Sequence, residues 1–154
     1  MEDAAAASPT KETGGIFIGT HQGVDILISK ATDAGPNAKR SECGFLRDTA
    51  YCQSVLDAEY SVSGADYVGE WHTHVVQLPQ PSTGDLATLA GIILDPDYRL
   101  PSFSMGLGVV SKESIDFLFY MVTIERRSLA KEKLALINVS RVVPSVKRAG
   151  AAED

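Results

Sequence analysis

The order of strand-like and helix-like apolar patterns along the chain is the feature that most constrains its fold. Six segments have the alternating or continuous apolar residues of β-strands: 14–20, 24–32, 43–49, 66–74, 102–112 and 114–125. Only two segments, residues 50–62 and 82–97, have clear helical spacing. Because the two kinds of segment do not alternate regularly, we expect an α/β domain with a mixed sheet and helices packed on it.

Local signals mark the ends of several predicted elements. Gly23 separates the first two strands as a turn residue. Gly64 ends the first helix, whereas Pro96 stops the second, which has Ser82 at its expected cap. Residues 130–143 fit either a helix or an amphipathic strand, and the pattern leaves both open.

The 154 residues have room for one compact domain. Residues 1–11 are small and polar, so we expect a flexible arm or one short helix there. The folded domain is expected to span residues 12–143, and residues 144–154 are expected to form a disordered tail.

Composition narrows the functional classes. A formal charge of −6 without a basic run argues against nucleic acid as the main ligand. The sequence has no long apolar stretch and no basic, apolar leader, so we expect a cytoplasmic protein that does not enter a membrane. Cys43 and Cys52 are too few and too far apart for a disulfide framework and are expected to be reduced thiols.

One constellation of residues indicates chemistry. His72 and His74 are two apart on a predicted strand, so both imidazoles project from the same face of the sheet. A loop then leads to Ser82 and to Asp85 in the first turn of a predicted helix. Two imidazoles and one carboxylate would hold Zn²⁺ with a fourth position open for water, as in catalytic zinc sites.

Amide hydrolysis also needs a base for the water proton and a donor for the developing oxyanion. Ser82 is placed to be the donor. Spacing alone does not identify the base, because Glu12 is sixty residues before His72, whereas Glu70 lies on the same strand face as both histidines.

Plainer interpretations exist for each of these residues. Ser82 and Asp85 could form only a capping box at the start of the helix. A Ser-His-Asp triad is disfavoured, because no nucleophile-elbow sequence surrounds Ser82. His21, in a probable turn, has no required role, and Trp71 alternates to the opposite face as a core residue.

The segment HTHVVQLPQPSTGD fits the HxHx₇SxxD signature and resembles the JAMM (MPN, or JAB) zinc metalloproteases, and KETGGIFIGT resembles their glutamate-bearing segment. Together with GEWHTH, it is most similar to short bacterial members, including the deconjugating peptidase of CBASS anti-phage operons. This resemblance implies a cytidine-deaminase-like, mixed, curved sheet flanked by helices. Val75 departs from the family pattern, which usually has Pro after the second histidine.

The resemblance also implies roles for single residues. Zinc would be held by His72, His74 and Asp85, with Glu12 as general acid and base and Ser82 steadying the oxyanion. The implied activity is that of a deubiquitinase-like isopeptidase acting after the C-terminus of a ubiquitin-like or otherwise conjugated protein.

The implied partners are conjugated proteins, such as a cGAS-like nucleotidyltransferase, or bacterial activating and conjugating enzymes. The substrate tail would add a strand to an exposed edge. Two other functions stay open: a non-catalytic MPN scaffold for protein interaction, and a zinc amidohydrolase acting on small molecules.

Overall fold

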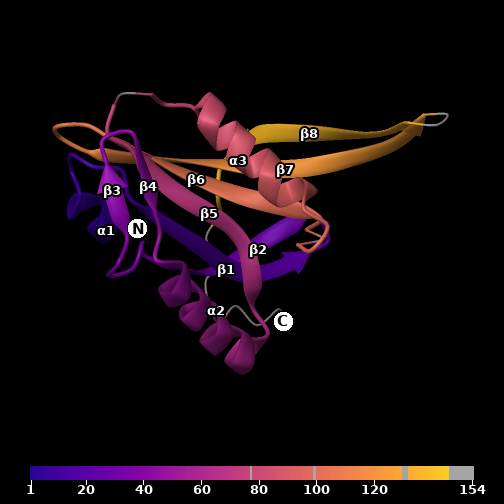
Figure 1. The fold of residues 1–154 in the computed structure, drawn as a ribbon, viewed down its shortest axis with the longest axis horizontal. Helices are drawn as coiled ribbons and strands as arrows, with labels where there is room; N and C mark the ends of the chain where they lie inside the picture. Colours follow the sequence, from indigo (N-terminus) through magenta and orange to yellow (C-terminus); the bar gives the residue numbers. More distant parts are fainter. Residues whose placement is uncertain (77, 99, 130–131, 146–154) are drawn as a thin grey trace, which may run out of the picture.

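The computed structural model describes residues 1–76, 78–98, 100–129 and 132–145. In these ranges the chain forms a mixed six-stranded sheet, a separate two-stranded hairpin and three helices (Figure 1). The elements, in chain order, are α1 (Glu2–Ala6), β1 (Gly14–Gln22), β2 (Asp25–Ala31), β3 (Lys39–Ser41), β4 (Gly44–Leu46), α2 (Thr49–Ser63), β5 (Asp66–His74), α3 (Thr83–Leu94), β6 (Ser102–Val110), β7 (Ile115–Leu129) and β8 (Glu132–Val142). The predicted α/β class, with a mixed, curved sheet flanked by helices, is confirmed.

The strands of the large sheet lie in the order β2-β1-β5-β6-β7-β8. β5 and β6 are parallel, whereas the other neighbouring strands pair antiparallel. The predicted hairpin is formed by β1 and β2, and Gly23 in its turn has φ of +69°, a conformation that glycine adopts without steric cost. The two histidine candidates for metal binding therefore lie on β5, near the middle of the sheet.

The structure corrects one predicted element and decides between the two alternatives for another. We expected a sheet strand at residues 43–49, but β4 pairs with β3, in a segment expected to be a loop, and forms a second, small sheet. Neither three-residue strand is long enough to show a period in the sequence. Residues 130–143 fitted a helix or a strand, and β8 pairs with β7 along its whole length.

The helices divide between the two faces of the sheet. α3 packs on an apolar cluster from β6 and β7, and α2 packs on Ile16 and Ile18 of β1. Directly paired residues project on the same face, and Glu70 pairs with Ile16 on one side and with Met105 on the other. α2 and α3 therefore cover the same face, near β1 and near β6–β7, respectively (Figure 1).

The opposite face of β5 and β1 is covered from the start of the chain. α1 buries Ala5 completely, in a cluster with Phe17, Val68 and Trp71. Of the two expectations for residues 1–11, the structure has the short helix. The limits predicted for the folded domain and the C-terminal tail remain predictions, and residues 146–154 lie outside the described residues.

Two further expectations concern the cysteines and the membrane. Cys43 is exposed and Cys52 is buried, and both are free thiols. Burial raises the pKa of the Cys52 thiol above its usual value. Within the described part of the chain, no helix has both the length and the apolar character that crossing a membrane requires.

Leu107, in the middle of β6, tests the position of the core. Its side chain is 0% exposed, so Leu107→Ala is expected to lower the free energy of unfolding by about 2–5 kcal/mol, through lost burial and the cavity left behind. Leu27→Ala, on edge strand β2 and 38% exposed, is the matched control and should cost less than about 1 kcal/mol. Urea denaturation measures both, and similar losses would contradict the described packing.

Candidate metal centre

Strand β5 presents its two histidines to the cleft and its neighbours to the core. Trp71 is 1% exposed, and its indole Nε1 donates to Thr32 O at 2.8 Å. Thr73 is also fully buried. Because side chains alternate along a strand, His72 and His74 project to the other face. The sequence-based prediction that the imidazoles share a face and that Trp71 is a core residue is confirmed.

His72, His74 and Asp85 converge as a possible metal-ligand set. The two Nε2 atoms are 3.1 Å apart, and Asp85 places Oδ1 3.1 Å from His72 Nε2 and Oδ2 3.2 Å from His74 Nε2. Zn²⁺ with ligands at about 2.0–2.1 Å in a tetrahedron has them about 3.3 Å apart, so this spacing fits such an ion. The donor set of two imidazoles and a carboxylate fits it as well.

The loop after β5 fixes the orientation of His74. Its Nδ1 lies 2.9 Å from the Leu78 carbonyl oxygen, and since a carbonyl can only accept, Nδ1 carries the proton. In the neutral ring, Nε2 then has its lone pair free for a cation. The loop therefore sets the tautomer that a metal site needs, although Val75 replaces the usual proline.

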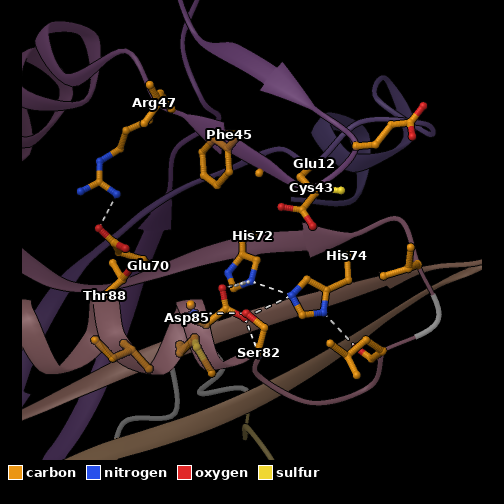
Figure 2. Close-up of a pocket in the computed structure, with 18 of the residues that line it drawn as sticks. Glu12, Cys43, Phe45, Arg47, Glu70, His72, His74, Ser82, Asp85 and Thr88 are labelled. Atoms are coloured by element: carbon orange, nitrogen blue, oxygen red, sulfur yellow. Dashed lines mark hydrogen bonds and ion pairs between the residues drawn. The ribbon is translucent and has the colours of Figure 1, made fainter.

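Asp85 serves the helix and the cluster at once. The Ser82 backbone N–H donates to Asp85 Oδ2 at 2.6 Å, and the Asp85 N–H donates to Ser82 Oγ at 3.2 Å, which is a complete capping box. The same carboxylate faces both imidazoles (Figure 2). The capping interpretation is therefore correct, but it does not describe all that Asp85 does.

The negative charge of Asp85 and the positive charge of a protonated His74 stabilise one another. Burial opposes ionisation of Asp85, but hydrogen bonds from His72 and His74 outweigh it and bring the pKa of the carboxyl well below its usual range. The hydrogen bond to Asp85 is the main cause that raises the pKa of His74, against the effect of burial. Without a cation, the site therefore favours an ionised aspartate beside a histidine that holds a proton more readily.

Glu12 comes to the site through the pairing of β1 with β5. Gly14 pairs with His72, and the Thr73 N–H donates to Thr13 O at 2.8 Å. One residue further in this antiparallel register, Glu12 comes beside His74. Figure 2 shows the Glu12 carboxylate pointing toward the two imidazoles. Strand pairing thus brings Glu12 close to the histidines in space, although sixty residues separate it from His72 in the sequence.

Glu12 and Glu70 differ in their surroundings. Burial raises the pKa of Glu12 above its usual value, while the two histidines act in the opposite direction. Glu70 forms an ion pair with Arg47 and accepts a hydrogen bond from Tyr67 Oη at 2.7 Å. Glu70 is thus engaged with two side chains, whereas the Glu12 carboxylate has no such partner among the described hydrogen bonds and ion pairs and points toward the imidazoles.

These groups line one cleft of about 650 Å³. The hairpin β3–β4 contributes Cys43, Phe45 and Leu46, and the first turns of α3 contribute Asp85 and Thr88. Ser82 also lines the cleft; its hydroxyl already accepts the Asp85 N–H, which leaves the hydroxyl proton for a third group. His21 lies outside the cleft, on strand β1 and not in the expected turn, with Nε2 2.9 Å from Ser102 O.

Three residues near the site were missed by sequence analysis: Arg40, Phe45 and Arg47. None of them belongs to a spaced motif; Phe45 and Arg47 line the cleft, and Arg40 contacts Thr13, the neighbour of Glu12. Their partners are far away in the sequence, as with Arg40 and Thr13. Only the pairing of β3 with β4 could have indicated them.

Similarity to a solved structure supports the fold. The structure of protein DSY2949 from Desulfitobacterium hafniense superimposes with a TM-score of 0.57 at 17% identity, covering 91% of this chain and 82% of that one. At this identity the similarity concerns the fold alone.

Three relatives are similar to this chain in sequence. A protein of Sinorhizobium fredii (strain NBRC 101917 / NGR234) named "Probable metalloprotease y4qB" is 39% identical over 94 residues, 58% of this chain and 57% of that protein. Two proteins named "CD-NTase/cGAS isopeptidase" are 32% identical over 90 residues in Enterobacter hormaechei and 31% over 78 residues in Vibrio cholerae. These matches cover 57% and 49% of this chain, respectively, and 49% and 50% of the relatives. The chain thus spans about half the length of these relatives.

A family model confirms the resemblance found in the metal motif. It describes the prokaryotic homologues of the JAB domain and matches residues 1–128, which include the histidine strand, the capping box and Glu12. One of the relatives is named a metalloprotease, and the other two are named isopeptidases. The chain belongs to the family of prokaryotic homologues of the JAB domain.

Proposed function

We propose that this chain is a zinc-dependent JAMM peptidase that cleaves an isopeptide or peptide bond at the C-terminus of a conjugated protein. The observation that carries the proposal is the meeting of His72, His74 and Asp85 with the Glu12 carboxylate in one cleft. A scaffold that only binds partners has no need of this combination of ligand spacing and an adjacent base.

Each residue has a distinct task in this proposal. His72, His74 and Asp85 hold the ion, which when bound acidifies a water molecule and polarises the carbonyl under attack. Glu12 accepts the proton of the attacking water and returns it to the leaving amine. The Ser82 hydroxyl donates to the carbonyl oxygen as negative charge develops there.

The proposed substrate is a protein with an extended C-terminal tail joined to a target. β4 pairs only with β3 among the described strands, and we propose that such a tail adds as a strand at its other edge. Two relatives are named for action on CD-NTase/cGAS, which makes a conjugated cGAS-like nucleotidyltransferase the first candidate. Membership of an anti-phage system and a place in the cytoplasm are parts of the same proposal.

Cleavage of a defined conjugate tests the function. The purified chain, loaded with Zn²⁺, is incubated with a nucleotidyltransferase whose C-terminus is fused to a target protein, and mass spectrometry locates the cut. We expect one cut directly after the C-terminus and none in the presence of a chelator. Cleavage of small amides without cleavage of the conjugate would favour an amidohydrolase, and failure to bind stoichiometric zinc would favour a scaffold.

The choice of base gives a prediction. Glu12→Gln is expected to keep the bound zinc but to abolish cleavage, because the amide cannot accept the proton. Glu70→Gln is the matched control and should retain much of the activity, since Arg47 and Tyr67 already occupy its oxygen Oε1. Metal analysis and initial rates measure the two effects. The reverse result would transfer the catalytic role to Glu70.

Binding of Zn²⁺ is expected to weaken as pH falls from about 8 to about 6, because a protonated imidazole cannot bind the ion. Asp85 raises the pKa of His74, so this loss begins at a higher pH than for an isolated histidine. A chelator competition series measures the affinity at each pH. A flat affinity across this range would exclude the imidazoles as ligands.

Asp85→Asn extends this experiment. It removes one ligand, and we expect an affinity loss beyond the roughly 10- to 100-fold caused by changing an outer-shell partner. Asp97→Asn, in the exposed turn after α3, is the matched control and should leave the affinity unchanged. Equal affinity in the two variants would remove Asp85 from the site.

A further inference from the structure

Glu12 lies outside the strand ladder that orders its neighbours. β1 begins at Gly14, and its pairing with β5 starts at that residue. Glu12 is two residues earlier, where the chain comes from the region of α1. Strand pairing brings the chain to the histidines, but the position of the Glu12 carboxylate depends also on contacts beyond this ladder.

One set of contacts joins Thr13, the residue after Glu12, to strand β5. The Thr13 N–H donates to Thr73 Oγ1 at 3.0 Å, and the Thr73 N–H donates to Thr13 O at 2.8 Å. Both threonines are buried, with 1% and 0% of their surface exposed. Because Thr73 lies between the two histidines, these bonds hold Thr13 in register with the proposed ligands.

A second set of contacts comes from the hairpin β3–β4. The Glu12 N–H donates to Ser41 O at 2.8 Å, and Arg40 Nε donates to Thr13 Oγ1 at 3.1 Å. Phe45 packs over Gly14 so closely that a Cβ built there would lie 2.5 Å from the phenyl Cζ. The hairpin thus contacts three consecutive residues, of which Glu12 is the first.

We propose that the hairpin β3–β4 is the element that positions Glu12, and that Arg40 is its positioning residue, acting through the Thr13 hydroxyl. The effect on catalysis rests on the proposed role of Glu12 as base. The effect on the Glu12 backbone rests only on the hydrogen bonds described above.

The chemistry of the contact favours arginine at this position. The Thr13 hydroxyl is buried, and a buried acceptor that loses its partner costs free energy. The guanidinium of Arg40 supplies this donor in a fixed plane. Lys39, the residue before it, is exposed. Since Ser41 is the next residue on the same strand, loss of the Arg40 contact also loosens the bond from Glu12 to Ser41 O.

The test compares Arg40→Ala with Lys39→Ala, an exposed change on the same strand. Arg40→Ala is expected to lower kcat about 10- to 100-fold with KM unchanged, as when a catalytic group is misplaced by about 1 Å. Zinc content should stay at the wild-type level, because the ligands are not touched. Lys39→Ala should leave kcat, KM and zinc content unchanged.

A pair of substitutions at Thr13 separates positioning from a general loss of structure. Thr13→Val removes the acceptor and should match Arg40→Ala in kcat, and the double variant should lose no more than either single one. Thr13→Ser keeps the acceptor and should stay close to wild type. Equal losses in the Ser and Val variants, or a change in KM alone, would overturn the assignment of Arg40.

Hydrogen exchange at the Glu12 amide gives a readout that needs no turnover. Arg40→Ala should speed this exchange about tenfold or more, because the bond to Ser41 O opens more often, while amides of β6 keep wild-type rates. Unchanged exchange at Glu12 would overturn the proposal. If the wild-type chain cleaves no conjugate, the proposed function fails, and the exchange rates still decide whether Arg40 orders Glu12.

Discussion

Burial of Trp71 is the constraint on which the arrangement of the site depends. The indole packs with Phe17 and Ala5 on one face of the sheet and donates its single N–H to Thr32 O. A shift of β5 by one residue would bring the indole into the cleft and both histidines into the core, so the core fixes the face on which His72 and His74 project. The apolar side of the sheet thus determines the geometry of its polar side.

The start of α3 adds the third candidate ligand, Asp85, without a separate supporting structure. A helix N-terminus favours a negative charge and provides unpaired N–H groups, and the capping box uses both to hold the Asp85 carboxylate. Each of its two oxygens then faces one imidazole nitrogen. One carboxylate satisfies the helix end and completes the cluster, which means that neither task can change independently.

Local patterns were sufficient for the parts of the molecule that local rules determine. Patterns within one strand or one helix predicted three features that the structure has. These are the shared face of the two histidines, the helix cap at Ser82 and the end of the helix before Pro96. The hairpin β3–β4 and the strand nature of β8 depend on pairing between segments, which no local period encodes. The same limit applied to Glu12, because its place near His74 depends on the register of β1 on β5 and on a bond to the hairpin, both between segments far apart in the sequence.

The two glutamates show how long-range contacts divide chemistry between similar groups. Glu70 was the closer candidate in sequence, two residues from His72 on the same strand face. Arg47 and Tyr67, however, both contact its Oε1, through an ion pair and a hydrogen bond. Glu12 is half-buried without such a partner for its carboxylate among the described hydrogen bonds and ion pairs, and burial makes it more basic. Proximity in sequence to the histidines is therefore a weaker criterion for proposing a base than the partners that each carboxylate acquires on folding.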